Sequence, residues 1–568
     1  MRIALKNCSV YKKLFLAFSK LSNLNALQLI CILFVALCLR LWGIQFGLPY
    51  RYHIDEAPYI ISALKIASGD LYIEYPFNSP NIFQIVLAVE YAALYIIGHL
   101  FDVFQSPQDI ANLYRSDPTV FFLLARGTNA VISTITIFLT YVLGKHLSNK
   151  RVGLLSAFFL AVMFSYARDA HYAVADTLIV FFVVSSTLCS VLYQKTVQLG
   201  YIILAGLAGG AAFGLKYLPA PILIVSLMAV VLHIQSHSRR FVVRRLSILA
   251  LSVLVGFFLA FPALFISLDL FLLHLRQAFG QASVALGNFQ VDDVPAWLYY
   301  LRIYVWGLGW PLFALALTGI VVLSICSGKE YVLIVVATIS YYLGISVVNT
   351  YFARYGLPIV PFLAIFAAGL VVTLTQSLQR WLRNQARMMI IYALAILLVI
   401  PTIVPLLRHD YLLTNVDTRT QAKVWIENNI PEGSRIVLQW YGPPLSTVND
   451  PEPNSTHVYD VFSLTPFMMG PNHYSLDTCI GEQIEYIVIN SFNTNLRLNS
   501  DSENALRARF YQSLDQDANL LVEFRPYSER KQALAFTWEQ LYGPADDLFL
   551  LDRPGPIIKV YSLTNSSR

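Results

Sequence analysis

Residues 355–376 read YGLPIVPFLAIFAAGLVVTLTQ and contain no charged side chain. A helix needs about 20 mainly apolar residues to cross the roughly 30 Å hydrocarbon core of a bilayer, so this run is long enough for one transmembrane helix. Similar runs recur along the chain near residues 25–47, 82–104, 118–144, 152–168, 172–193, 200–215, 217–234, 245–268, 298–325, 331–349 and 387–407. Their number predicts a polytopic α-helical membrane protein.

The composition favours the same fold class. Of the 568 residues, 57% are hydrophobic and 13% are charged, whereas soluble domains average about 45–50% apolar and about 25% charged residues. The net charge of +6 does not indicate a nucleic-acid partner, because the Lys and Arg residues stand in short clusters between the apolar runs. Such clusters are typical of the loops that set the orientation of membrane proteins.

The basic loops predict the topology. Three of them should lie in the cytoplasm together with the N-terminus: Lys145–Arg151, His237–Arg245 and Arg380–Arg387. This holds if the run Ile82–Leu100, which includes Gln, Glu and His side chains, lies in the interface instead of crossing. About eleven transmembrane helices then remain. We expect a multi-pass protein of the inner (plasma) membrane with its C-terminal region outside the cytoplasm.

Two domains are expected. Residues 1–409 form the transmembrane domain, with a long first loop, 49–118, and a second long segment, 268–295, on the outer face. Residues 410–568 form a soluble extracytoplasmic α/β domain, because turns, amphipathic helices and short alternating strands replace the apolar runs. Its predicted elements are helices at 420–429 and 503–514 and strands at 435–440, 484–489 and 556–561.

Acidic side chains mark two candidate catalytic positions. Asp55 and Glu56 open a predicted helix, 55–68, in the first outer loop. They are explained either as a helix cap and charges that favour the helix dipole, or as a general base poised at the membrane surface. Asp176 lies just inside an apolar run, where an acid is costly and suggests function, although a structural hydrogen bond would also explain it.

Three cations are predicted near the outer face: Arg126, Lys216 and Arg354. Each could extend harmlessly to the interface. Together they could bind a lipid-linked phosphate, since Arg matches phosphate oxygens bidentately.

Five short motifs, in order, resemble those of the GT-C glycosyltransferase superfamily, family 39, which includes protein O-mannosyltransferases and the lipid A aminoarabinose transferase. The matching segments are His53-Ile-Asp-Glu56 with Ser68-Gly-Asp70, Ala125-Arg-Gly127, His171-Tyr-Ala-Val-Ala-Asp176, Ala353-Arg-Tyr-Gly-Leu-Pro-Ile-Val-Pro361 and Thr418–Gly433. The Lys-Pro pair of the aminoarabinose transferases and the trefoil domain of the eukaryotic mannosyltransferases have no counterpart here.

This resemblance implies a GT-C fold and a polyprenyl-phosphate sugar donor, with inversion at the anomeric carbon during transfer of a hexosyl or pentosyl group to a lipid, glycan or protein acceptor. Asp55 would act as the base, Asp176 and Glu56 would complete the catalytic acids, and Arg126, Arg354 and Lys216 would bind the donor phosphate. No cofactor follows from the motifs, and no metal ligands are assigned, although a divalent metal ion stays open as a candidate.

The alternative is a transporter in which Asp176 is a coupling site within the membrane. The two hypotheses predict different structures. A glycosyltransferase should bring Asp55, Asp176 and a cation together at one outer cavity. A transporter should hold its acid at the midplane of a two-fold pseudo-symmetric bundle.

Overall fold

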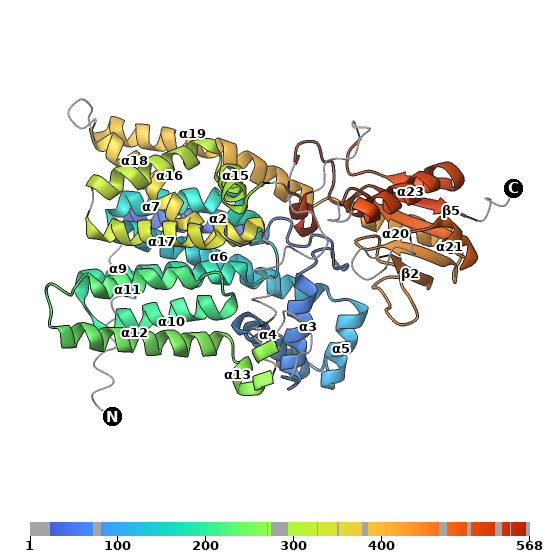
Figure 1. Ribbon diagram of the computed structural model, residues 1–568, viewed down its shortest axis with the longest axis horizontal. Helices are drawn as coiled ribbons and strands as arrows, with labels where there is room; N and C mark the ends of the chain where they lie inside the picture. The colour runs from blue at the N-terminus through green and yellow to red at the C-terminus, as the bar shows by residue number, and fades with distance from the viewer. Residues whose placement is uncertain are drawn as a thin grey trace.

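The computed structural model describes residues 23–71, 81–269, 271–273, 276, 294–326, 328–348, 351–377, 384–464, 474–496, 501–528, 537–545 and 547–563. Within these ranges the chain forms a bundle of long helices, and a second region built on a β-sheet lies at one end of the bundle (Figure 1). The predicted fold class, a polytopic helical protein with a C-terminal α/β region, is confirmed.

Most helices of the bundle run side by side along its long axis (Figure 1). They are α2 (Asn23–Leu41), α6 (Thr119–Leu147), α7 (Lys150–Val162), α9 (Asp176–Thr196), α10 (Leu199–Leu215), α11 (Leu223–Val231), α12 (Arg239–Ala260), α16 (Trp310–Cys326), α17 (Lys329–Ser346), α18 (Val360–Ser377) and α19 (Asn384–Leu413). Shorter segments complete it: α8 (Phe164–Asp169), η1 (Ala220–Ile222), α13 (Ala263–Ile266), α15 (Ala296–Leu308) and η2 (Ala353–Ile359).

By length and composition, six helices of the described residues could cross a membrane, or seven if α15 and α16, bent by 118°, count as one span. Four shorter apolar helices accompany them, at Asn25–Leu41, Leu199–Leu215, Ala220–Val231 and Glu330–Ser346. These helices make the chain a multi-pass membrane protein, while the number of eleven spans stays a prediction.

The first outer loop folds into three helices at the end of the bundle nearest the sheet: α3 (Glu56–Ala67), α4 (Ile82–Leu100) and α5 (Pro107–Ser116) (Figure 1). Helix α4 is apolar and long enough to be one of the six candidate spans. Its contacts lie at this end of the bundle, because the rings of Tyr59 and Phe83 join it to α3 and the Tyr91 hydroxyl donates to the carbonyl of Phe121 in the first turn of α6. The interfacial position of this helix stays a prediction.

The basic loop 145–151 meets the end of α9 at the opposite end of the bundle. Lys195, in the last turn of α9, lies 3.9 Å from Glu330 at the start of α17, and its ammonium group donates to the carbonyl of His146 at the end of α6. The loop 145–151 therefore lies at the end away from α3 and α4. The third predicted basic loop, 380–387, and the second outer segment, 268–295, fall largely outside the described residues.

Helices α10 and α12 pack with their backbones in contact. A Cβ on Gly210 would lie 2.1 Å from the carbonyl oxygen of Val253, and one on Gly214 would lie 2.6 Å from that of Phe257. Small residues allow such close approach between membrane helices. Because the residue numbers rise together, the two helices are parallel, so the basic start of α12 lies at the same end as the start of α10.

The C-terminal region contains a five-stranded sheet in the order β2-β1-β3-β5-β4. Strands β1 (Arg435–Gln439), β2 (Asp460–Leu464) and β3 (Tyr486–Asn490) are parallel, and β5 (Ile558–Ser562) is antiparallel to both β3 and β4 (Asn519–Phe524). Helix α20 (Thr418–Asn429) packs on one face, and α21 (Leu476–Gly481) and α23 (Asp501–Asp517) pack on the other. The last short helices are α22 (Ser491–Thr494) and η5 (Trp538–Tyr542).

The sheet region packs directly on the first outer loop and on the end of α19. The Tyr52 hydroxyl lies 2.7 Å from that of Thr420, and the Arg419 guanidinium lies 3.9 Å above the Tyr52 ring. The Arg408 side chain of α19 donates to carbonyl groups of residues 548 and 551. The outer loop is therefore enclosed between the bundle and the sheet.

Candidate active site

Four charged side chains from separate segments meet at the end of the bundle that faces the sheet. Asp55 precedes α3, Asp176 is the first residue of α9, Lys216 follows α10, and Arg354 lies in η2. The Lys216 ammonium group lies 2.5 Å from Asp176 Oδ1. Arg354 Nη2 lies 3.0 Å from Asp55 Oδ2, and Arg354 Nε lies 3.9 Å from Asp176 Oδ2. The charges alternate in sign, so each acid has a cation beside it.

A small cavity opens at this cluster. The charged residues Asp176, Lys216 and Arg354 line it, together with the rings of Tyr341 and Tyr355 and an apolar wall of Ile179, Leu218, Pro219 and Pro358. An apolar wall lowers the local dielectric constant, and fixed charges then act on a ligand more strongly than they would in water.

Aromatic rings surround the Arg354 guanidinium. Its central carbon lies 4.1 Å from the ring centre of Tyr542, 4.6 Å from that of Phe352 and 5.7 Å from that of Tyr355. Rings at these distances attract the cation and restrict its rotamers. The side chain is nevertheless 11% exposed, so one side of it can meet a ligand.

Asp55 is the most accessible acid of the cluster, with 36% of its side chain exposed. It occupies the N-cap position of α3, but its side chain forms no capping hydrogen bond. The predicted capping role of Asp55 is therefore wrong, because the carboxylate turns to Arg354 instead. Its backbone N–H donates to His53 Nδ1 at 3.3 Å, and burial, together with nearby Arg354, holds the pKa of His53 well below its ordinary value.

Glu56 and Arg126 form a separate, buried ion pair. Arg126 Nε and Nη2 donate to the two carboxylate oxygens at 2.8 and 2.7 Å, and the side chains are 0% and 1% exposed. Arg126 Nη1 also donates to the carbonyl groups of Ile44 and Phe46, and Glu56 Oε1 accepts from the N–H of Ala173. The pair thus connects four segments: the residues after α2, the start of α3, α6 and the loop before α9. Both side chains are engaged in these contacts and do not join the charged cluster.

The C-terminal region supplies two residues beside Arg354 that were not predicted from the sequence, Glu539 and Tyr542. Tyr542 lies over Arg354, and Glu539 binds Arg168 and the backbone N–H of Ala353, the residue before Arg354. Arg168 Nη1 lies 3.6 Å from Asp169 Oδ2 of the same helix and closer, at 3.0 Å, to Glu539 Oε2. The segment around Glu539 carries no periodic pattern, and its role depends on a contact between residues far apart in the chain.

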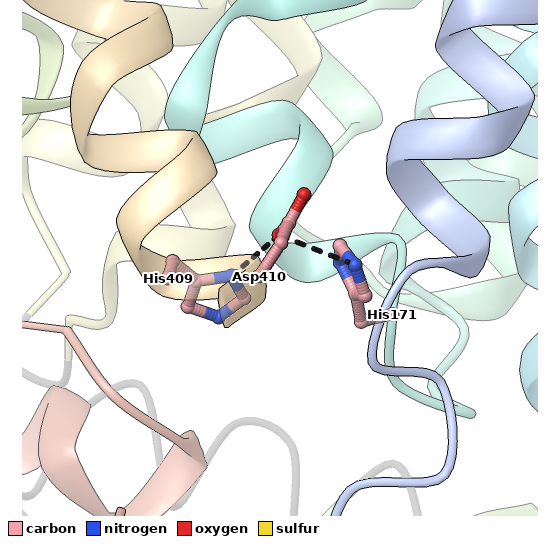
Figure 2. Close-up of side chains that lie close together, drawn as sticks. All are labelled: His171, His409 and Asp410. Carbon is pink, nitrogen blue, oxygen red and sulfur yellow. Dashed lines mark hydrogen bonds and ion pairs between the residues drawn. The ribbon is translucent and has the colours of Figure 1, made fainter. Parts of the chain in front are cut away.

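A second polar group joins the segment between α8 and α9 to the end of α19 (Figure 2). His171, His409 and Asp410 are described residues whose potential ligand atoms all lie within 4.8 Å of one another, and all three are buried. His409 Nδ1 and His171 Nε2 lie 2.9 and 3.4 Å from Asp410 Oδ1. Burial lowers the pKa of His171 to about 4, so its imidazole is neutral at physiological pH.

Two His nitrogens and a carboxylate oxygen are the ligand types that a transition metal such as zinc takes from a protein. The cluster of Asp55 and Asp176 is less suited to a divalent ion, because Lys216 and Arg354 already balance its charge. Within the part of the chain that the structure describes, the residues best suited to hold a metal ion are therefore not those predicted to perform the chemistry, and no cofactor is established.

Comparisons with known proteins were made for the sequence and for the fold. Residues 123–266 match the model of the family described as dolichyl-phosphate-mannose-protein mannosyltransferase. This segment includes Arg126, Asp176 and Lys216 and leaves out Asp55 and Arg354. No curated protein matches the chain.

Solved structures share the fold. The oligosaccharyltransferase of Archaeoglobus fulgidus in its apo form has a TM-score of 0.51 and 13% sequence identity, over 91% of this chain and 76% of that chain. ArnT from Cupriavidus metallidurans bound to undecaprenyl phosphate has a TM-score of 0.49 and 12% identity, over 95% of this chain and 98% of that chain. At these identities the likeness concerns the fold alone.

The predicted resemblance to the GT-C superfamily is therefore confirmed by a family match over residues 123–266 and by a fold shared along most of the chain. Together these similarities support a membrane glycosyltransferase.

Proposed function

We propose that the protein transfers a hexosyl or pentosyl group from a polyprenyl-phosphate carrier to an acceptor hydroxyl, with inversion at the anomeric carbon, and that the cavity beside Asp55 and Asp176 is the active site. The observation that carries this proposal is that two acids and two cations from four distant segments meet in one charged cluster. Asp176, Lys216 and Arg354 of this cluster line the cavity, and Asp55 contacts Arg354 beside it. The family name of the matched segment, which specifies a dolichyl-phosphate-linked sugar, supports a lipid-phosphate donor.

The donor phosphate is assigned to Arg354 and Lys216. Both line the cavity, and a guanidinium beside an ammonium group suits a phosphate that gains charge as the sugar leaves. Arg126 was also predicted to bind phosphate, but four of its five N–H groups already donate to protein oxygens. We assign it, with Glu56, to holding the outer loop in place.

Asp55 is assigned as the general base. The acceptor oxygen would attack the anomeric carbon and pass its proton to Asp55, while the bond between that carbon and the phosphate oxygen breaks and the lipid phosphate leaves. A phosphate bound to Arg354 would compete with Asp55 for the guanidinium, so donor binding would release the carboxylate to accept a proton. Asp176 would orient the acceptor or stabilise positive charge on the sugar, and it would hold Lys216 toward the phosphate.

The transporter hypothesis predicted an acid at the midplane of the bundle. Asp176 is instead the first residue of α9 and lies beside Arg354 and Lys216 at the bundle end that contacts the outer loop. This position favours the glycosyltransferase, for which the acid meets Asp55 and a cation at one cavity.

The location in the cell follows from the same proposal. The cavity would face the periplasm or lumen, with residues 1–409 as the catalytic membrane domain and 410–568 as the extracytoplasmic domain of an inner-membrane protein whose N-terminus is cytoplasmic. The basic loop 145–151 and the basic start of α12, which lie at the far end of the bundle, support this orientation. Reporter fusions at Ser148 and Ser455 should report opposite sides, and a cytoplasmic signal at Ser455 would contradict the orientation.

The test of function uses purified protein with polyprenyl-phosphate mannose, aminoarabinose, glucose or galactosamine and a mixture of lipid and glycan acceptors. We expect transfer from at least one donor by the parent protein, with inverted configuration in the product by NMR. Asp55→Asn should be inactive with that donor, whereas Asp517→Asn, on an exposed position of α23, should match the parent. Full activity of Asp55→Asn would remove Asp55 as the base.

A further inference from the structure

We infer that the segment Trp538–Tyr542 of the C-terminal region completes the candidate active site, and that Glu539 is a positioning residue for Arg354. This inference rests on the proposed function and deepens it. It assigns to the C-terminal region a part in binding the donor phosphate, which the outer loop and the bundle were expected to do alone.

Glu539 connects two parts of the membrane bundle. Its Oε2 accepts from Arg168 Nη1 at 3.0 Å, and its backbone carbonyl accepts from Arg168 Nη2 at 3.0 Å. Its Oε1 accepts from the backbone N–H of Ala353 at 2.9 Å and from the Tyr299 hydroxyl at 3.4 Å. One carboxylate therefore fixes the first residue of η2, and the next residue of η2 is Arg354.

The hydrogen bond from the Ala353 N–H to Glu539 is important because Ala353 begins η2, the helix that positions Arg354. This short 3₁₀-helix bears Arg354 at its second position, and the first N–H groups of a helix have no partner within the helix. Glu539 satisfies one of these groups and holds the backbone that aims the guanidinium into the cavity. Without Glu539, that N–H would be buried without a partner, and the start of η2 would have to move to find one.

Tyr542 contacts the Arg354 side chain, whereas Glu539 binds the backbone of the residue before it. Its ring centre lies 4.1 Å from the Arg354 guanidinium carbon, and its ring also lies 5.5 Å from that of His53, two residues before Asp55. The segment thus touches Arg354 and the loop of the proposed base together, so it can set their separation.

Close packing at the end of the segment limits how far it can move. Gly543 has a φ of +117°, and a Cβ there would lie 2.0 Å from the Tyr172 hydroxyl oxygen. Arg168 is fully buried, and a buried guanidinium that loses its carboxylate partner is strongly destabilised. Backbone approach and charge pairing therefore both hold the segment in the site.

The experiment compares four variants of the full chain in detergent: Glu539→Ala, Glu539→Gln, Tyr542→Phe and the control Glu523→Ala. Glu523 lies in β4 and pairs with Arg525, away from the cavity. Two readouts are taken: the Kd for undecaprenyl phosphate as probe, and hydrogen exchange of residues 353–359 by mass spectrometry.

We expect Glu539→Ala to raise the Kd about tenfold or more, as loss of hydrogen bonds to a charged group does, and to speed exchange in 353–359. Glu539→Gln keeps an acceptor for Ala353 and should recover part of both effects. Tyr542→Phe keeps the ring but removes the hydroxyl that accepts from Arg354 Nη2 at 3.5 Å, so it should raise the Kd less than Glu539→Ala does. Glu523→Ala should not differ from the parent. Where transfer is measured, the donor KM should rise more than kcat falls.

The outcomes separate this inference from the proposed function. If the parent binds the probe and Glu539→Ala binds it equally well, the positioning role is overturned. If the parent does not bind the probe, the proposed donor site fails, and exchange alone then decides the inference. Unchanged exchange in 353–359 would overturn it, and faster exchange in Glu539→Ala with no change in Glu523→Ala would support it.

Discussion

Asp55 and Glu56 are neighbours in the chain, and each pairs with an arginine, but the two pairs differ in almost every physical respect. Asp55 is 36% exposed and makes one contact of 3.0 Å with Arg354. Glu56 is fully buried and holds Arg126 through two hydrogen bonds while accepting a third from Ala173. Successive residues of a helix point about 100° apart, so at the start of α3 one acid turns to Arg354 and the other to the buried Arg126.

The difference in burial between the two ion pairs predicts different roles, one in catalysis and the other in stability. A buried pair with every oxygen bonded is costly to break, because the remaining charge has no water and no partner. A partly exposed pair with one contact can exchange its partner for a ligand at little cost. We therefore expect mutations of the first pair to act on chemistry and mutations of the second to act on folding.

The largest expected effect is that of Asp55→Asn on transfer. The change keeps the size of the side chain and removes its ability to take a proton at neutral pH, so the rate should fall by about 10²–10⁴-fold. The thermal unfolding midpoint should not move, because Asp55 makes no capping bond in α3. A loss of stability equal to the loss of activity would make the two acids alike and contradict the comparison.

Arg126→Ala should be the most destabilising change, at about 3–5 kcal/mol, since it leaves the Glu56 carboxylate buried without its partner. The measurement is the thermal midpoint in detergent. The double variant Glu56→Gln/Arg126→Gln should recover part of the loss, because neither buried charge remains. Glu56, predicted either to favour the dipole of α3 or to join the catalytic acids, should then affect folding first, and a stable but inactive Glu56→Gln would return it to the site.

Arg354→Ala should weaken donor binding by about 1.5–3 kcal/mol, the value of a hydrogen bond to a charged group. Arg354→Lys should recover only part of this, because an ammonium group lacks the planar fork of arginine. Isothermal or fluorescence titration with the accepted donor tests both variants. If both bind like the parent, Lys216 would be the main phosphate ligand.

The smallest expected effect concerns His53 and pH. Its pKa is held well below the ordinary value by burial, so only the unfolded state gains a proton as the pH falls below about 6.5. The parent should lose up to about 1.4 kcal/mol of stability per pH unit in that range, and His53→Asn should lose less. Parallel stability curves for the two proteins would mean that His53 is protonated in the folded state.

Local patterns predicted many individual elements. The helix at 55–68 appears as α3, and the strands at 435–440, 484–489 and 556–561 appear at shifted boundaries as β1, β3 and β5. Strands β2 and β4 were not predicted, and neither was the order of the sheet. Alternating apolar residues indicate a strand, but they carry no information about its neighbours, which are set by contacts between distant segments.

The sequence by itself determined that this is a multi-pass membrane protein and which charged residues are candidates for its site. Long uncharged runs have one physical solution, a helix in lipid, and charges placed between them are costly enough to be informative. Only the tertiary structure decided which charges work together: it paired Asp176 with Lys216 and Asp55 with Arg354, and it turned Arg126 and Glu56 inward. It also brought Glu539 to the base of η2. Such pairings depend on where distant segments meet, because an ion pair is set by ångström distances and by burial that no local pattern records.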